Sequence, residues 1–152
     1  MNFPNEVEIL LVEDNPQDEE LTLRALKERN IANQLFVARD GAEALDYLYR
    51  RGQFANRTPG PLALVLLDLK MPKVDGLEVL RQIKSDPALR LTPVVMLTSS
   101  REEVDLLRSY QLGVNAYVVK PVGFHEFIDA VKLLGGFWAV VNETPPGGRL
   151  RA

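Results

Sequence analysis

Residues 62–68, Leu-Ala-Leu-Val-Leu-Leu-Asp, decide the fold of this chain. Residues 62–67 are all apolar, which suits a β-strand only where both faces of the sheet are covered, because a strand with one solvated face alternates apolar and polar side chains. Sheets of this kind are mostly parallel and carry helices on both faces. We therefore expect the chain on either side of this run to supply the helices and the neighbouring strands.

The rest of the chain alternates short apolar runs with longer amphipathic segments. Further strands are predicted at Val7–Val12, Gln34–Ala38, Pro93–Leu97 and Ala116–Val119. Apolar periodicity and capping residues predict helices at Pro16–Arg29, from Asp40 to about Arg51, at Leu77–Ser85, at Ser100–Leu112 and from about Phe124 to Leu134. With right-handed crossovers, this alternation predicts an α/β fold: a doubly wound, five-stranded parallel sheet of order 2-1-3-4-5 with helices on both faces, as in flavodoxin-like proteins.

The composition is that of an ordinary globular chain, with 152 residues, a formal net charge of −3, 46% hydrophobic residues and no cysteine. We expect one domain at residues 1–143, followed by a Pro- and Gly-rich tail at 144–152. The absence of cysteine excludes a disulfide framework, a thiolate metal site and a cysteine nucleophile. The sequence shows no basic cluster, signal-peptide pattern or membrane-length apolar run, so we expect a cytoplasmic protein that binds neither nucleic acid nor membrane.

Polar residues follow the predicted strands at the edge where ligands bind in such sheets, beyond the carboxyl ends of the strands. Glu13 and Asp14 follow the first strand, and Asp68, Thr98 and Lys120 follow the third, fourth and fifth. Two carboxylates ~4 Å apart repel by about 4 kcal/mol at an effective dielectric constant of ~20, so three of them require a counter-cation. Carboxylate oxygens without histidine or cysteine nearby favour Mg²⁺ or Mn²⁺.

Each of these residues has a simpler interpretation when it is taken alone. Asp14 fits a helix cap, Asp68 a turn, Thr98 a strand end and Lys120 a solvated lysine. Their joint occurrence at one edge favours a functional site. His125, the single histidine, lies on the last predicted helix away from the strand ends, and we expect it at the surface.

Four segments of the chain resemble the signature segments of the response-regulator receiver domain. They are VEILLVEDN (7–15), LVLLDLKMPKVDG (64–76), VVMLTSS (94–100) and AYVVKPV (116–122). The resemblance covers about residues 7–134. It implies a single-domain two-component response regulator that accepts a phosphoryl group from a sensor histidine kinase and signals to a downstream protein by changing conformation. Such a protein is not a metabolic enzyme, although it catalyses its own phosphorylation and slow dephosphorylation.

The resemblance also implies residue roles in phosphoryl transfer and metal binding. Asp68 is the implied phosphoacceptor, and Glu13, Asp14 and Asp68 hold Mg²⁺ together with the backbone carbonyl of Lys70. Lys70 and Ser99 depart from the commonest receiver pattern. Both positions line the path of the hydrolytic water, so they would tune the lifetime of the phosphoryl group, although plain solvation also explains Lys70.

Further implied roles concern the response to phosphorylation. Thr98 and Lys120 bind the phosphoryl group, and the Lys120–Pro121 peptide bond is cis. Tyr117 matches the aromatic position whose rotamer responds to Thr98. The resulting change reshapes the surface of the fourth helix, fifth strand and fifth helix. Phosphorylation is then a local change of charge that shifts this surface between two conformations.

Two enzyme-like or ligand-binding alternatives conflict with the sequence. Phosphatases of the haloacid-dehalogenase type place a second aspartate two residues after the nucleophile, where this chain has Lys70. A nucleotide or flavin site needs a Gly- or Ser/Thr-rich loop after the first strand, whereas Glu13–Pro16 repels anions. A receiver-fold interaction module that works without phosphorylation remains as the alternative.

Three features are similar to stand-alone regulators that pair with phytochrome-type histidine kinases. They are the turn-rich connection Arg51–Pro61, residues 83–100, and Phe137-Trp138 with the tail that follows. This similarity implies a bacteriophytochrome as the kinase and a homodimer in which Phe137 and Trp138 make contacts. These two aromatic residues also fit a role in completing the core of the monomer.

Overall fold

The structure is a computed structural model, and it describes residues 8–27, 34–57, 62, 64–69, 71, 74–109 and 116–133. Its elements are, in chain order, β1 (Glu8–Val12), α1 (Pro16–Lys27), β2 (Gln34–Ala38), α2 (Gly41–Tyr49), the 3₁₀ helix η1 (Gly52–Phe54), β3 (Leu64–Asp68), α3 (Gly76–Ser85), β4 (Val94–Thr98), α4 (Arg101–Ser109), β5 (Tyr117–Val119) and α5 (Phe124–Leu133).

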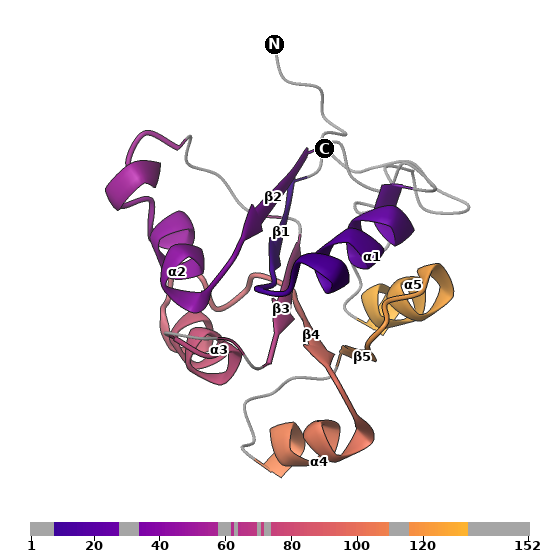
Figure 1. Cartoon of the computed structure of the whole chain (residues 1–152). Coiled ribbons are helices and arrows are strands. Elements are labelled where there is room, and N and C mark those ends of the chain that lie inside the picture. Colours follow the sequence, from indigo (N-terminus) through magenta and orange to yellow (C-terminus); the bar gives the residue numbers. More distant parts are fainter. Residues whose placement is uncertain are drawn as a thin grey trace, which may run out of the picture.

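The five strands form one parallel sheet in the order β2-β1-β3-β4-β5, which confirms the predicted topology. Helices α1 and α5 lie on one side of the sheet and α2 and α3 on the other, and α4 follows the carboxyl end of β4 (Figure 1). Strand β1 pairs with both β2 and β3, and Leu10 lies opposite Phe36 on one side and Val65 on the other. The strand order therefore reverses between β1 and β3, which is where such sheets bind ligands.

Strand β3 lies in the middle of the core, as its apolar sequence predicts. All five of its residues are buried. Val65 and Leu67 pack in a cluster with α2 and α3, whereas Leu64 and Leu66 pack in a second cluster with α1 and α5. Because burying one leucine side chain contributes about 1.5–3 kcal/mol, this strand stabilises both layers at once.

The predicted strand and helix ends differ from the structure by a few residues. Strand β4 begins at Val94, because Pro93 has no N–H, although its carbonyl still accepts a hydrogen bond from Val65 N at 2.9 Å. Helix α2 is capped by Asp40, which accepts from Glu43 N at 2.8 Å. The Glu43 carboxylate accepts from the backbone N–H of Arg39, one residue before the cap, at 2.9 Å.

Part of the turn-rich connection after α2 forms a helical turn that the sequence pattern does not predict. Helix α2 ends at Tyr49, its C-cap residue Arg50 is in the left-handed conformation (φ 54°), and η1 begins two residues later at Gly52. Phe54 of η1 packs edge-on against Phe36 and Tyr47, with both ring centroids 5.2 Å away. The Arg57 guanidinium lies 4.2 Å from the centre of the Tyr47 ring. These contacts fasten the connection to the β2 edge of the sheet.

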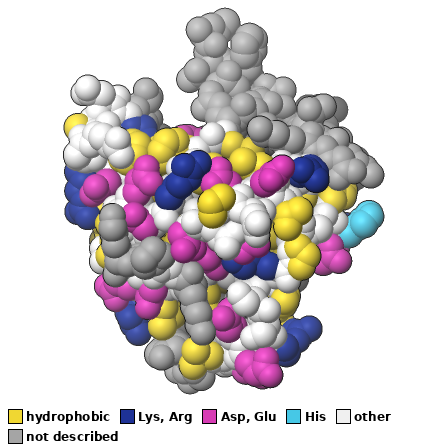
Figure 2. Space-filling model, in the orientation of Figure 1, with side chains coloured by type: hydrophobic (Ala, Val, Ile, Leu, Met, Phe, Trp, Pro, Cys, Tyr) yellow, Lys and Arg dark blue, Asp and Glu magenta, His cyan; other side chains and the backbone are white. Residues whose placement is uncertain are grey.

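The outer surface mixes charges of both signs. On the described part of the face drawn in Figure 2, acidic side chains alternate with basic and apolar ones. His125 is exposed on α5, as expected from the sequence. Among the described helices, none has the length and apolar character needed to cross a bilayer.

Candidate functional site at the carboxyl ends of the strands

Three carboxylates meet where β1 and β3 end. Oxygen atoms of Glu13, Asp14 and Asp68 lie within 4.8 Å of one another. Glu13 is fully buried and Asp68 is 4% exposed, whereas Asp14 is exposed. The register explains the meeting, because Val12 pairs with Leu67, and Glu13 and Asp68 follow these two residues. The cluster therefore consists of two buried carboxylates and one that is exposed to solvent.

Burial and mutual repulsion work against full ionisation of this cluster. Loss of hydration, followed by the charge of Asp68, raises the pKa of Glu13 from 4.5 to about 7, although Lys120 opposes the shift. Loss of hydration also raises the pKa of Asp68, again against the effect of Lys120. A divalent cation would replace the retained proton, and a set of three carboxylates is the donor chemistry that Mg²⁺ and Mn²⁺ prefer. The residues present fit a hard divalent ion.

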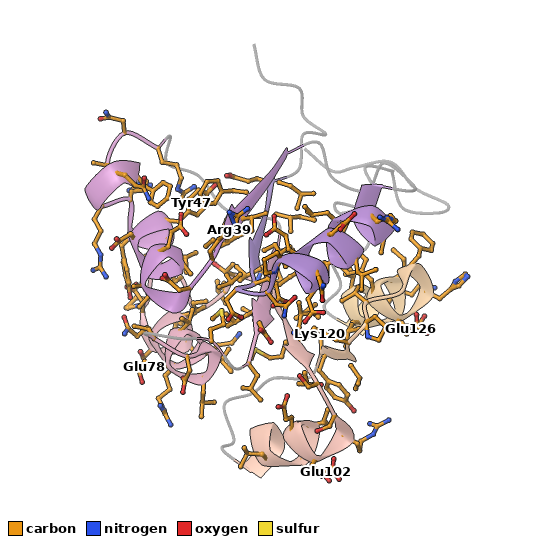
Figure 3. All side chains as sticks on the ribbon, in the orientation of Figure 1. Arg39, Tyr47, Glu78, Glu102, Lys120 and Glu126 are labelled. Atoms are coloured by element: carbon orange, nitrogen blue, oxygen red, sulfur yellow. The ribbon has the colours of Figure 1, made fainter. Side chains whose placement is uncertain are left out.

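Lys120, directly after β5, brings a positive charge to the same place. Its Nζ atom lies 3.4 Å from Glu13 Oε1, 3.4 Å from Asp68 Oδ1 and 2.9 Å from Asp18 Oδ2. Burial by itself would lower the pKa of Lys120, but the Asp18 hydrogen bond and the nearby carboxylates raise it. The ammonium therefore stays protonated, and Figure 3 shows it next to the start of α1. The Lys120–Pro121 peptide bond is cis.

Thr98, the last residue of β4, places a buried hydroxyl at this edge. The residue is fully buried, and its Oγ1 atom has no hydrogen-bond partner within the described part of the chain. An unsatisfied buried polar group costs about 1–3 kcal/mol. Asp68 pairs with Leu97, the residue that precedes Thr98 in β4. A polar group attached to Asp68 would therefore lie close to the end of β4, where the Thr98 hydroxyl is.

Backbone pairing holds these residues in position. The Glu13 N–H donates to the Ala38 carbonyl at 2.9 Å, and the Lys120 N–H donates to the Thr98 carbonyl at 2.7 Å. Gly76 lies so close to β3 that a Cβ atom there would be 2.0 Å from the carbonyl oxygen of Asp68. Gly76 can therefore pack against the end of β3 only because it has no side chain.

The other residues singled out from the sequence lie around this centre or outside the described residues. Ser99 is exposed, and its N–H donates to Glu103 at 2.7 Å. Tyr117 is half-buried, and its hydroxyl accepts from Arg101 Nη1 at 3.4 Å. Lys70, Phe137 and Trp138 lie outside the described residues.

Asp18 is a residue of this site that the sequence pattern does not predict. It lies on the first turn of α1 and is 33% exposed, yet it makes the shortest contact of the Lys120 ammonium. A signal was available, since the first turn of the helix after β1 lies at the same edge as Glu13 and Asp14. The sequence does not show that its partner is Lys120, which is 102 residues away.

A separate cleft of about 570 Å³ opens at the other end of the strands, beside Leu62 and Pro93. Three of the ionisable residues that line it, Tyr49, Arg57 and Asp86, interact with one another or with the backbone. The pKa of Tyr49 is raised by burial and then by the charge of Asp86, and Asp86 also accepts from the Ala88 N–H at 2.7 Å. Arg57 donates to the Tyr47 carbonyl at 2.9 Å. The reactive groups of the described chain therefore gather at the carboxyl ends and not in this cleft.

Comparison with known proteins agrees with this geometry. The family model of the response regulator receiver domain matches residues 9–132. The chain therefore belongs to the response regulator receiver family.

Similar proteins include several response regulators, some of which are described as phytochrome response regulators. The bacteriophytochrome response regulator AtBRR has a solved structure with 63% identity and a TM-score of 0.87, covering 92% of this chain and 100% of that one. Response regulator Rcp1 of Synechocystis sp. is 42% identical over 130 residues, which is 86% of this chain and 87% of Rcp1. A solved structure of Rcp1 is described as its Mn²⁺-bound form, with 39% identity and a TM-score of 0.68, covering 96% and 99% of the two chains.

The phosphorylated cyanobacterial phytochrome response regulator RcpA is also similar. Its solved structure shares 42% identity and a TM-score of 0.70, covering 88% of this chain and 94% of that one. The similarity to these response regulators thus extends over most of the chain.

Proposed function

We propose that this protein is a cytoplasmic, phosphorylation-controlled response regulator in which Asp68 accepts a phosphoryl group from a sensor histidine kinase. The observation that carries the proposal is the group of three carboxylates within 4.8 Å of one another, with the Lys120 ammonium 3.4 Å from Asp68. In this proposal Glu13, Asp14, Asp68 and the backbone carbonyl of Lys70 hold Mg²⁺. The description of a Mn²⁺-bound form of the relative Rcp1 supports the binding of a divalent ion.

The transfer joins an Asp68 carboxylate oxygen to phosphorus while the bond from phosphorus to the kinase histidine nitrogen breaks. The product is an acyl phosphate, and the electron pair of the broken bond returns to the histidine. A bound divalent cation offsets negative charge on the transferring oxygens. Lys120 supplies further positive charge from the protein, and the Thr98 hydroxyl donates to a phosphoryl oxygen. The description of RcpA as phosphorylated supports this chemistry in a relative.

The signal in this proposal is a change in the surface formed by α4, β5 and α5. Thr98 is in β4, next to β5, and Tyr117 begins β5. When Thr98 moves to the phosphoryl group, Tyr117 moves inward, which breaks the contact between its hydroxyl and Arg101. The altered surface then binds or releases a downstream protein.

The similarity to AtBRR and RcpA, both described as phytochrome response regulators, supports a phytochrome-type histidine kinase as the source of the phosphoryl group. We propose residues 1–143 as one receiver domain, with 144–152 as a tail. We further propose a homodimer with contacts at Phe137 and Trp138. Lys70 and Ser99 would set how fast water removes the phosphoryl group, because both neighbour the site in sequence.

Labelling with radioactive acetyl phosphate tests the phosphoacceptor. The wild-type protein is expected to incorporate label only with Mg²⁺ or Mn²⁺ present, and Asp68→Ala is expected to incorporate none. Glu20→Gln, which removes a solvent-exposed carboxylate of α1 paired with Arg24, is the matched control and should label normally. Undiminished labelling of Asp68→Ala would refute the assignment. A wild-type protein that takes no label would favour an interaction module that works without phosphorylation.

A further inference from the structure

The Lys120 ammonium has three donors and three carboxylate neighbours. It donates hydrogen bonds to Glu13 Oε1 at 3.4 Å and to Asp18 Oδ2 at 2.9 Å, and it forms an ion pair with Asp68 Oδ1 at 3.4 Å. Glu13 and Asp68 belong to the acidic cluster that fits a metal ion, whereas Asp18 does not. Of the three carboxylates that contact Lys120, Asp18 is therefore the one outside the cluster that fits a metal ion.

The position of Asp18 is set by the start of α1. The side chain of Asn15 accepts hydrogen bonds from the N–H groups of Gln17 and Asp18, both at 2.9 Å, which caps the helix. On the β2 side, Glu19 pairs with Arg39 through two hydrogen bonds of 3.2 and 3.0 Å. The first turn is therefore held from both sides, and the Asp18 carboxylate is ordered before any ligand arrives.

A bound divalent cation changes the balance of contacts around Lys120. It would occupy lone pairs of Glu13 and Asp68 and would repel the ammonium, because both carry positive charge. Asp18 is the carboxylate of the three that keeps its full charge for Lys120 in that state. Its contact at 2.9 Å would then supply the main attraction that keeps the ammonium beside Asp68.

Resting on the proposed function, we propose that Asp18 is a positioning residue that holds Lys120 at Asp68 during phosphoryl transfer. One N–H of the ammonium stays on Asp18, and another is presented to the incoming phosphoryl oxygen. The Lys120 side chain is 12% exposed, so this pair is shielded from solvent far more than the Glu20–Arg24 pair of the same helix, whose side chains are about 70% exposed. Exposed pairs of the latter kind contribute little.

The experiment measures the rate of Asp68 phosphorylation by acetyl phosphate at saturating Mg²⁺. Asp18→Ala is expected to slow the reaction about three- to tenfold, the loss expected from one partly shielded charge-assisted hydrogen bond. Asp18→Asn, which keeps an acceptor oxygen but no charge, should fall between Asp18→Ala and the wild type. Glu20→Ala removes the same charge from the same helix without touching Lys120, and its rate should stay within about twofold of the wild type.

A double-mutant cycle with Lys120→Met separates positioning from general structural damage. If Asp18 acts through Lys120, Asp18→Ala adds no further loss in the Lys120→Met background. An equal loss in both backgrounds, or an Asp18→Ala rate equal to that of Glu20→Ala, would overturn the proposal. Thermal unfolding of each variant shows whether it is folded. If Asp18→Ala is not folded, the same double-mutant cycle is measured with Asp18→Asn and tests the proposal instead.

Failure of this inference is distinct from failure of the proposed function. Labelling that depends on Asp68 but is indifferent to Asp18 would overturn the positioning role and leave the phosphoacceptor intact. Labelling that persists in Asp68→Ala would remove the basis of both.

Discussion

Replacing Glu13 by glutamine is expected to stabilise the metal-free protein at pH 8. Glu13 is fully buried, and burial together with Asp68 raises its pKa from 4.5 to about 7. Because the folded state binds the proton more tightly than the unfolded state does, the free energy of unfolding falls as the pH rises from about 4.5 to about 7. Above that range the ionised side chain costs about 3 kcal/mol, since each pKa unit corresponds to about 1.4 kcal/mol.

The net gain is smaller because glutamine replaces one of the two accepting oxygens. Glu13 accepts from Lys120 with one oxygen and from the Asn15 N–H with the other, at 3.4 and 3.3 Å. Losing one of these acceptors costs about 1 kcal/mol. We therefore expect Glu13→Gln to raise the free energy of unfolding by about 2 kcal/mol at pH 8 and to leave it nearly unchanged at pH 5.

Urea unfolding followed by circular dichroism, in EDTA at the two pH values, measures the effect. Glu20→Gln is the control, because its carboxylate is exposed, and it should change the unfolding free energy by less than about 0.5 kcal/mol. Added Mg²⁺ should reverse the order, since the ion stabilises only a folded state that binds it and the variant lacks one ligand charge. A Glu13→Gln protein that is less stable than the wild type in EDTA at pH 8 would refute this account of the cluster.

Two further predictions concern the backbone and the hydroxyl around Asp68. Gly76→Ala should destabilise the protein by about 2–4 kcal/mol in urea unfolding, because its Cβ would lie 2.0 Å from the Asp68 carbonyl oxygen. Gly123→Ala, whose Cβ would approach chiefly the flexible end of Glu126, should cost clearly less, and equal losses would contradict the argument. Thr98→Val should leave the unphosphorylated protein at least as stable as the wild type, because the buried hydroxyl has no partner in the described structure. The same substitution should shorten the lifetime of the acyl phosphate, measured by loss of label. A loss of stability with an unchanged lifetime would count against the role of Thr98.

Much of the candidate site could be predicted because parallel strands bring their carboxyl ends to one edge. Once residues 62–67 indicate a central buried strand, the positions of Glu13, Asp68, Thr98 and Lys120 follow from where each strand stops. Strand periodicity and helix caps are local properties, so they can be read from neighbouring residues. The sheet order follows from the same alternation with the handedness of crossovers.

The remaining features depend on side chains that meet across long stretches of chain. Asp18 and Lys120 are 102 residues apart, and nothing near either residue in sequence indicates the other as its partner. The helical turn Gly52–Phe54 is stabilised by the rings of Phe36 and Tyr47, which local propensity does not register.

The amino-acid sequence alone determined which residues reach the ligand-binding edge, because a strand pattern fixes where each strand ends. The tertiary structure decided the protonation state of those residues and which of them form ion pairs. The pKa of Glu13 is raised by burial and by the nearby charge of Asp68. The ion pair between Asp18 and Lys120 forms because α1 and the end of β5 lie within 2.9 Å of each other at these two side chains. Such energies depend on burial and separation in space, and neither quantity is encoded by spacing along the chain.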